Sequence, residues 1–276
     1  MAYIHWVPDG ILVDFGFYAL RWYSVLFASG FLFSYILLRK KFRAEGVAGV
    51  MLEKLTIYVV IATVIGARLG HCLFYDFAYY SQHPLEIFLP VRFQPELAFT
   101  GFQGLASHGG VMAILIAVSL YSYRYQVALF WILDKLALVS PLAGCLIRVG
   151  NLFNSEIIGR PTSVPWAFVF ERVDLIPRHP GQLYEAISYL LIFILLHTLE
   201  PKLNRKPGFI FGLFLVLLFL ARFLLEFFKA DQSVFEAGML LNMGQLLSIP
   251  FILLGFILLV LKNQKQSIIV KEPPAA

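Results

Sequence analysis

The sequence predicts an all-α, polytopic membrane protein with about seven transmembrane helices. Hydrophobic residues make up 59% of its 276 residues and charged residues only 14%, whereas soluble domains carry about a quarter charged residues. The mean hydropathy is +0.77, and apolar runs close to the ~20 residues that cross a bilayer recur along the chain. Lipid rather than water is therefore the expected surrounding of most of the chain.

The apolar runs define the expected spans. The run that begins at Gly110 is short and the run that begins at Phe130 contains Pro141, so either of these two helices can be tilted or partly re-entrant. We expect one membrane domain over residues 1–276, with a disordered tail at 265–276. The seven expected spans are Leu20–Leu38, Leu55–Phe74, Gly110–Tyr123, Phe130–Ile147, Leu183–His197, Phe209–Phe228 and Gln245–Leu261.

Basic residues collect beside alternate ends of these runs. Because cytoplasmic loops hold the excess of Lys and Arg, this pattern predicts an N-terminus outside, a C-terminus in the cytoplasm, and outer loops at residues 76–103 and 157–182. The same pattern accounts for the net charge of +5, so we do not expect nucleic-acid binding. The basic groups are Arg39, Lys40, Lys41 and Arg43; Arg124 and Lys135; Lys202, Arg205 and Lys206; and Lys262, Lys265 and Lys271.

Three arginines lie inside or at the edge of apolar runs: Arg68, Arg148 and Arg222. A charge at the centre of a spanning helix costs at least about 2.5 kcal/mol, so such residues need partners, water or a ligand. Arg222 and Glu226 are four residues apart, a spacing that permits a structural ion pair. The alternative is a ligand site: few acidic residues lie at a similar depth, so part of the positive charge of the three arginines is not neutralised. A guanidinium matches a phosphate in charge and geometry. Arg68 lies between Gly66 and Gly70, whose spacing also fits a structural strut at a helix crossing.

Two further segments are candidates for a site. Gly150, Asn151, Asn154 and Gly159 follow the run that contains Arg148, and we expect them to unwind the helix and to expose polar donors around the arginine; a purely structural turn is the alternative. His108 precedes two glycines at the start of a helix, where the dipole favours the neutral imidazole that accepts protons. We expect the glycines to let a bulky substrate approach.

Tyr23 and the segment from Arg178 to Glu185 remain open. An aromatic residue at the outer end of the first span is ordinarily an interfacial anchor. The segment Arg178-His179-Pro180-Gly181-Gln182-Leu183-Tyr184-Glu185 is polar and turn-forming, and it can either cap the following helix or close over a site. Cys72 and Cys145 lie in apolar runs without metal-ligand spacing, which favours buried packing roles.

These motifs together resemble the prolipoprotein diacylglyceryl transferase family. The resemblance runs from Arg21-Trp22-Tyr23 through Gly66-Ala67-Arg68, Ser107-His108-Gly109-Gly110 and the signature Arg148 to Gly159, then through His179 to Glu185 and Arg222 to Phe228, to Met243-Gly244-Gln245-Leu246-Leu247-Ser248-Ile249-Pro250. Ile147 and Ser24 stand where the family commonly has glycine, which affects local packing but leaves the reactive groups in place.

The resemblance implies a multi-pass protein of the bacterial inner membrane. Such a protein takes phosphatidylglycerol, transfers its diacylglyceryl group to the lipobox cysteine of a prolipoprotein signal peptide, and releases glycerol phosphate. It implies that Arg148 and Arg222 bind the phosphate and are catalytic, and that His108 is a catalytic base. Site or supporting positions are implied for Tyr23, Asn151, Glu156, Gly159 and Glu226, with Arg68 a further candidate for substrate contact.

The implied chemistry needs a base and cations, because a thiol must lose its proton to attack carbon and the leaving phosphate gains charge. We expect no metal and no cofactor, and membrane lipids as the surroundings. One competing class is an anionic-lipid transporter or flippase, which also uses intramembrane arginines and predicts an internal repeat. Another is a non-enzymatic receptor or scaffold for lipidated proteins.

Overall fold

The computed structural model describes residues 3–16, 19–89, 91–93, 98–99, 104–203, 206–230 and 239–261. These residues fall into two compact units: the described residues up to Leu38 and from Leu133 onward form unit 1, and those of Arg39–Ile132 form unit 2. The predicted tail at 265–276 lies outside the described residues, and the single-domain organisation stays a prediction.

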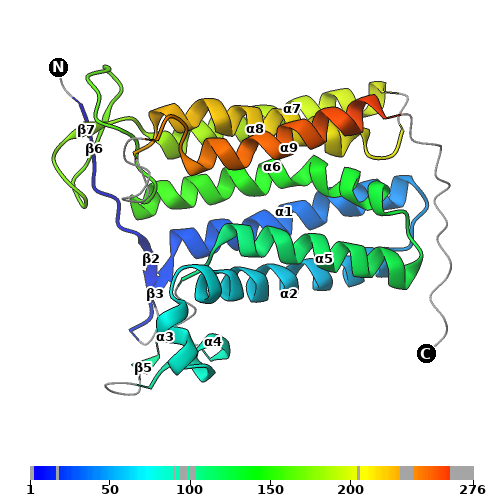
Figure 1. The fold of residues 1–276 in the computed structure, drawn as a ribbon, viewed down its shortest axis with the longest axis horizontal. Helices are drawn as coiled ribbons and strands as arrows, with labels where there is room; N and C mark the ends of the chain where they lie inside the picture. Colours follow the sequence, from blue (N-terminus) through cyan, green and yellow to red (C-terminus); the bar gives the residue numbers. More distant parts are fainter. Residues whose placement is uncertain are drawn as a thin grey trace. The chain divides into compact units, whose positions relative to one another are not determined.

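The all-α membrane fold is confirmed (Figure 1). Seven long helices occupy the predicted runs, and six of them are long and apolar enough to cross a membrane; the exception, α5, has polar ends. Many large apolar side chains on these helices are exposed, which is the pattern of a surface that faces lipid tails. The long helices are α1 (Trp22–Ala44), α2 (Gly49–Phe74), α5 (Ser107–Tyr125), α6 (Leu129–Asn154), α7 (Gly181–Leu199), α8 (Phe209–Leu225) and α9 (Met243–Val260).

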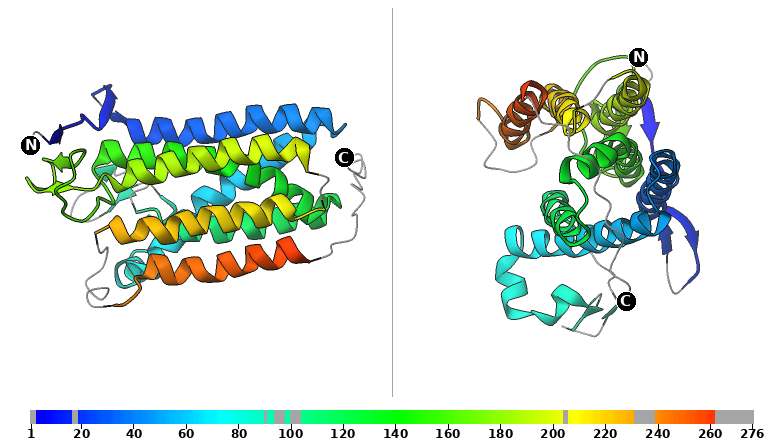
Figure 2. Two further views of the ribbon diagram at one scale, coloured as in Figure 1. Left: turned by 90° about the horizontal axis from the view of Figure 1, so that it is seen from above. Right: turned by 90° about the vertical axis from the view of Figure 1, so that its right-hand side faces the viewer.

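In unit 1, α8 packs against both α7 and α9 (Figure 2). Gly212 of α8 and Gly255 of α9 bring these two helices close: a methyl group on Gly212 would lie 2.9 Å from Leu258 Cβ, and one on Gly255 would lie 2.8 Å from Val216 Cγ2. A core formed by residues such as Leu138, Tyr189 and Ile210 joins α6, α7 and α8. The helix α6 runs through Pro141 without interruption, and it is long and apolar enough to cross a membrane, although the sequence allowed a partly re-entrant helix here.

The ends of α6 and α8 are held by buried polar groups. Asp134, on the first turns of α6, accepts hydrogen bonds from the backbone N–H groups of Gly208, at 2.8 Å, and of Phe211, at 2.7 Å. These N–H groups belong to the start of α8, where a helix has donors without partners and a positive dipole end. Asp134 of α6 thus fixes where α8 begins.

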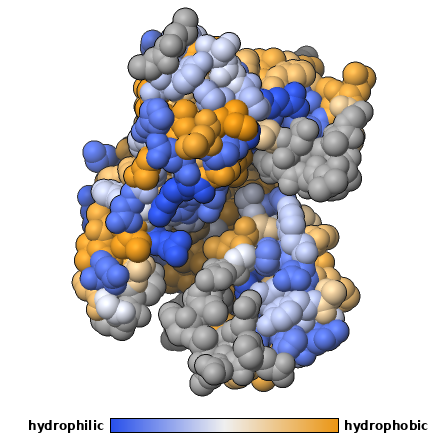
Figure 3. Space-filling view, turned by 90° about the vertical axis from the view of Figure 1, so that its left-hand side faces the viewer, coloured by the Kyte–Doolittle hydropathy of each residue, from blue (hydrophilic) through white to orange (hydrophobic). Residues whose placement is uncertain are grey.

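Short strands, which the sequence analysis did not predict, complete unit 1. The strand β6 (Phe168–Phe170) pairs in parallel with β1 (Ile4–Trp6) and antiparallel with β7 (Pro177–Arg178), while β2 (Ile11–Asp14) and β3 (Ala19–Arg21) form a hairpin. Strands of two to four residues are too short for an alternating pattern to stand out in the sequence. Figure 3 views the end of the molecule that carries β6 and β7, where hydrophilic residues lie among hydrophobic ones.

In unit 2, α2 and α5 pack closely along their small residues. A methyl group on Gly109 would lie 2.7 Å from Gly70 Cα and would also collide with the carbonyl oxygen of Gly66. This is the close crossing that small residues four apart permit. The expected outer loop 76–103 contains two short helices, α3 (Phe77–Gln82) and α4 (Leu85–Phe88), and a hairpin of β4 (Val91–Arg92) with β5 (Ala98–Phe99).

Candidate active site

The signature residues after Arg148 stay helical, which corrects the expected unwinding. The helix α6 continues through Gly150 and Asn151 to Asn154, and the chain leaves it through Ser155 and Ile157, whose φ angles are 55° and 57°. Positive φ is uncommon for residues other than glycine, above all for a β-branched residue such as isoleucine. The helix therefore ends about two turns later than the predicted end at Ile147, in a sharp turn at Ser155 and Ile157 that contains no glycine.

Gly150 is needed for a close contact rather than for a break in the helix. A methyl group at this position would lie 2.9 Å from Cδ2 of Tyr23 and 3.3 Å from its Cα. Tyr23, on the first turn of α1, is half-buried and stacks on Phe27. It is close enough to Arg148 and Glu156 to interact electrostatically with both side chains. The predicted site residue Tyr23 therefore packs directly on the signature helix.

Asn151 links Arg148 to Glu156. Nη1 of Arg148 donates to Oδ1 of Asn151 at 3.3 Å, and Nδ2 of Asn151 donates to Oε2 of Glu156 at 2.9 Å. The other oxygen of Glu156 accepts from Asn154 at 3.1 Å. The structure thus brings together three predicted site residues, and it orients the amide of Asn151 between a cation and a carboxylate.

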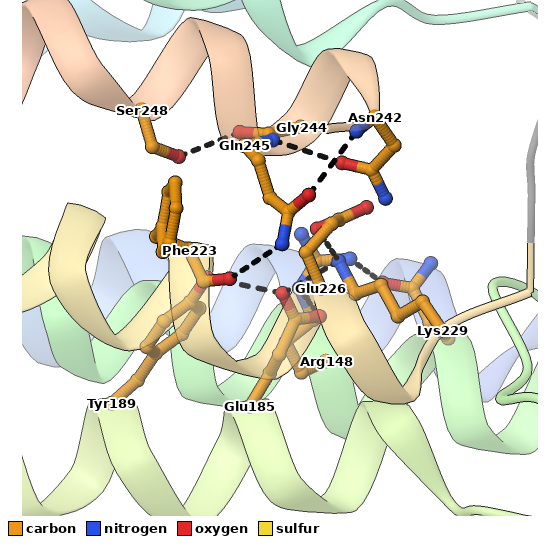
Figure 4. Close-up of polar contacts among 11 residues, drawn as sticks. Arg148, Glu185, Tyr189, Phe223, Glu226, Lys229, Asn242, Gly244, Gln245 and Ser248 are labelled. Carbon is orange, nitrogen blue, oxygen red and sulfur yellow. Dashed lines mark hydrogen bonds and ion pairs between the residues drawn. The ribbon is translucent and has the colours of Figure 1, made fainter. Parts of the chain in front are cut away.

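Arg148 also belongs to a buried chain of alternating charges (Figure 4). Its Nε lies 2.9 Å from Oε2 of Glu185, and Oε1 of the same carboxylate lies 2.9 Å from Nζ of Lys229. Lys229 lies 3.0 Å from Oε2 of Glu226. Arg148 therefore shares the carboxylate of Glu185 with Lys229, a pairing that the sequence analysis did not predict.

Arg222 differs from Arg148 in its surroundings. The permitted ion pair with Glu226 does not form, because Glu226 binds Lys229 instead. Within the described part of the chain, the guanidinium of Arg222 makes no hydrogen bond and no ion pair, although it is close enough to Glu185 to interact with its charge. Of the three predicted arginines, Arg222 is the one whose charge has no direct partner among the described residues.

The segment from Arg178 to Glu185 begins α7 and contributes to the charge network. Gln182 donates from Nε2 to the carbonyl oxygen of Glu156, and Glu185, one turn further, is fully buried against Arg148. Just before the helix, burial lowers the pKa of His179 below its ordinary value. The segment therefore starts a helix and also aims a carboxylate into the candidate site, which answers the question that the sequence left open.

Gly159 lies where three backbone segments meet. Its N–H donates to the carbonyl of His179 at 3.0 Å, and the neighbouring N–H of Arg160 donates to the carbonyl of Phe228 at 2.9 Å. A methyl group on Gly159 would lie 2.6 Å from Cβ of His179 and 2.8 Å from the oxygen of Phe228. The residue is thus positioned to hold the chain next to Lys229, while direct contact with substrate stays a prediction.

An ion pair in the loop before α7 supports this junction. Arg178 binds the carboxylate of Asp174 through Nε, at 3.1 Å to each oxygen, and its Nη1 donates to the carbonyl of Gly159 at 3.3 Å. The hydrogen bond from Arg178 holds the pKa of Asp174 below its ordinary value of 3.8. The loop is therefore fixed to Gly159 by a charged side chain.

In unit 2, His108 lies in the first turn of α5 and is exposed. Its Nε2 lies 2.8 Å from the hydroxyl of Tyr75. The two glycines after it do not leave room for a substrate, because Gly109 packs against the backbone of α2. The expected role of the glycines is therefore corrected, whereas the role of His108 itself stays a prediction.

Arg68 binds protein groups of unit 2. The buried guanidinium donates to the backbone carbonyls of Glu86 and Ile87 and lies over the ring of Tyr80, with Cζ 4.8 Å from the ring centroid. Glu86 in turn accepts from Tyr79 and from the N–H of Phe93. These contacts correspond to the strut alternative, with α4 rather than a helix crossing as the element held.

Two central members of the network, Glu185 and Lys229, were not among the predicted site residues. Glu185 stands in the recognised segment, but its partner Arg148 is distant in sequence. Lys229 directly follows an apolar run and thus resembles an ordinary flanking charge. The sequence shows that Lys229 and Glu185 lie near the ends of apolar runs. Only the fold shows that they meet Arg148 and Glu226 in one network.

The fold and these residues define a polytopic membrane protein that holds a buried network of charges at the ends of its helices. The model of the prolipoprotein diacylglyceryl transferase family matches residues 10–261, and the chain belongs to that family. It is therefore a transferase.

Three relatives are named phosphatidylglycerol–prolipoprotein diacylglyceryl transferase. The one from Tolumonas auensis is 45% identical over 266 residues, covering 96% of this chain and 99% of the relative. One from Bacteroides fragilis is 44% identical over 269 residues, covering 96% and 97%. One from Chloroherpeton thalassium is 45% identical over 269 residues, covering 96% of each. The transporter and receptor alternatives receive no support from these relatives.

Proposed function

We propose that this chain transfers the diacylglyceryl group of phosphatidylglycerol to the lipobox cysteine of prolipoproteins, the first step of lipoprotein maturation. The observation that carries the proposal is the arginine pair of unit 1: Arg222 has no ion partner in the described residues, and Arg148 lies in a network that fixes its orientation. The names of the relatives identify the two substrates.

The reaction places specific demands on the site. The cysteine thiol gives up its proton, the sulfur attacks the glyceryl carbon of the lipid, the carbon–oxygen bond to phosphate breaks, and a thioether and glycerol phosphate result. The phosphate changes from a monoanionic diester to a monoester with about −1.5 to −2 charges. Fixed cations that meet this growing charge lower the barrier, because they need not reorganise during the reaction.

The proposed roles follow from this chemistry. Arg222 and those donors of Arg148 that are not engaged by Glu185, Asn151 or Tyr189 bind the phosphate, since a guanidinium carries five N–H groups. Tyr23, Asn151 and Glu156 line the lipid head group, and Glu226 and Gly159 support the cations. His108 accepts the thiol proton as a general base.

The proposed setting is the bacterial inner membrane, with the N-terminus outside and the C-terminus in the cytoplasm. The distribution of Lys and Arg beside the helices supports this orientation. Membrane lipids surround the apolar, exposed helix faces.

The test is an assay in detergent with purified protein, phosphatidylglycerol and a lipobox peptide. The expected product is a peptide heavier by one diacylglyceryl group, together with glycerol phosphate. Arg222→Gln is expected to lower kcat by at least about 100-fold, the scale on which fixed groups that bind developing charge contribute. A peptide in which serine replaces the lipobox cysteine is the control and should stay unmodified.

Two results would contradict the proposal separately. Absence of transfer by the wild-type protein would overturn the function, and wild-type rates in the Arg222→Gln variant would overturn the phosphate-binding role of this residue. For His108, glutamine substitution with unchanged rates at every pH would remove the assignment as base and leave the arginines untouched.

A further inference from the structure

Lys229 is the most deeply buried cation of the charge network. Its side chain is 2% exposed, and its Nζ lies between two carboxylates, 2.9 Å from Glu185 and 3.0 Å from Glu226. Burial of a charge is costly unless it is paired on all sides. A lysine in this position is therefore enclosed by protein, and it acts through the groups that it holds.

The two oxygens of Glu185 divide their partners. Oε1 binds Lys229, and Oε2 binds Nε of Arg148. The contact at Nε is an ion pair without a hydrogen bond, because Oε2 has no hydrogen-bond partner among the described residues, and it holds the guanidinium of Arg148 beside Glu185 while Nη1 donates to Asn151. Lys229 and Arg148 thus share one carboxylate, so Lys229 helps to hold Glu185 where it positions Arg148 (Figure 4).

The other partner of Lys229 is held by the start of α9. A methyl group on Gly244 would lie 2.5 Å from Cδ of Glu226 and 2.7 Å from each of its carboxylate oxygens. The start of α9 is itself fixed by a capping box between Asn242 and Gln245, and Nε2 of Gln245 donates to the carbonyl of Phe223 at 3.4 Å. Glu226 is therefore confined, and Lys229 is confined with it.

The charges of this cluster do not cancel. Arg148, Arg222 and Lys229 are three cations and Glu185 and Glu226 are two buried carboxylates, so this cluster carries one positive charge; Glu156, which Asn151 links to Arg148, is exposed and is not counted in it. Removal of the ammonium would leave two cations against two carboxylates. A neutral cluster would bind a phosphate monoester poorly, because electrostatic interactions in a buried site are weakly screened.

We propose that Lys229 is a positioning residue that aims Arg148 and keeps the cluster positive, and that it thereby determines the affinity of the site for the phosphate monoester released in the reaction. The inference rests on the proposed function for the identity of that monoester. It requires no contact between Lys229 and the substrate.

The experiment compares Lys229→Met with Lys229→Arg. Direct binding of glycerol phosphate to the purified protein is measured alongside kcat and KM for transfer. Methionine is expected to weaken glycerol phosphate binding about tenfold or more, as loss of a buried ionic partner does, whereas arginine is expected to stay within about threefold because it retains the charge.

A matched control is the buried pair of Lys135 with Glu200, 3.8 Å apart in the same unit. Lys135 lies on α6 about 20 Å from Arg148 at 1.5 Å per residue. Lys135→Met removes a buried lysine from an ion pair without touching the cluster. This variant should bind glycerol phosphate like the wild-type protein, whatever its loss of thermal stability.

Charge compensation separates the electrostatic effect from a general loss of structure. The double variant Glu226→Gln with Lys229→Met restores one net positive charge, and it is expected to bind glycerol phosphate more tightly than Lys229→Met alone. Equal weakening in Lys135→Met, no recovery in the double variant, or wild-type binding in Lys229→Met would each overturn the inference. Failure of the wild-type protein to transfer lipid, with these binding differences intact, would overturn only the proposed function.

Discussion

Replacement of Gly159 by alanine tests whether the junction beside Lys229 holds the candidate site together. The added methyl group would lie 2.6 Å from Cβ of His179 and 2.8 Å from the oxygen of Phe228, and neither atom is at the end of a flexible side chain. The backbone must therefore move. The hydrogen bonds most directly strained are those of Gly159 to His179, at 3.0 Å, and of Arg160 to Phe228, at 2.9 Å.

The expected destabilisation is about 3 to 5 kcal/mol, from about 1 kcal/mol for each of two hydrogen bonds and about 1 to 3 kcal/mol for overpacking. Gly181→Ala is the control, because a methyl group there would meet its nearest atom, Cγ of Lys229, at 3.6 Å, an ordinary contact distance. We expect a change of less than about 1 kcal/mol for this control.

The assay is thermal unfolding in detergent together with hydrogen exchange of residues 158–160 and 228–230. Gly159→Ala should lower the unfolding temperature and speed exchange in both segments, and Gly181→Ala should do neither. If both alanine variants unfolded and exchanged like the wild-type protein, the three segments would not be coupled through Gly159, and the proposed support of Lys229 by this junction would be wrong.

Three further predictions concern other parts of the chain. Gly109→Ala, whose methyl group would lie 2.7 Å from Gly70 Cα, should destabilise the crossing of α2 and α5 by about 1 to 3 kcal/mol, measured as loss of thermal stability; unchanged stability would contradict the close crossing. The folded-state pKa of Asp174 is depressed by Arg178, so its stabilising contribution is complete above pH 3.8 and is lost as pH falls through the lower, folded value. Hydrogen exchange in the loop should then rise in acid, and Asp174→Asn should abolish that pH dependence; the same acid response in the variant would refute the assignment. Tyr75→Phe removes the 2.8 Å hydrogen bond to His108 and should slow transfer about fivefold, for about 1 kcal/mol, without changing lipid binding, and an unchanged rate would show that the hydroxyl does not assist the histidine.

The helices were largely predictable from the sequence because each apolar run must satisfy its backbone within lipid. The predicted break after Arg148 was wrong for a physical reason: glycine and asparagine weaken a helix, but packing of Gly150 against Tyr23 outweighs that preference. Similarly, Gly109 suggested room for a substrate, and its space is taken by α2.

The partners of the arginines were not predictable, since ion pairs across helices depend on how the helices pack. Arg148 and Glu185 lie on different helices, and an acid near in sequence, Glu226, turned out to pair with Lys229 rather than with Arg222. Charge counting along the chain therefore did not predict the partner of Arg148 and did not single out Lys229. The sequence indicates which polar groups belong to the site. The fold shows which of these groups form ion pairs with each other.

The uninterrupted course of α6 restricts how this protein can change over evolutionary time. Asp134 binds the start of α8, and Arg148 and Asn151 lie further along the same helix. Insertion or deletion of one residue between them would turn every later side chain by about 100° around the helix axis. Residues between Asp134 and Arg148 can be substituted as long as the new side chains pack. The number of residues in this stretch is therefore more strictly constrained than their identity.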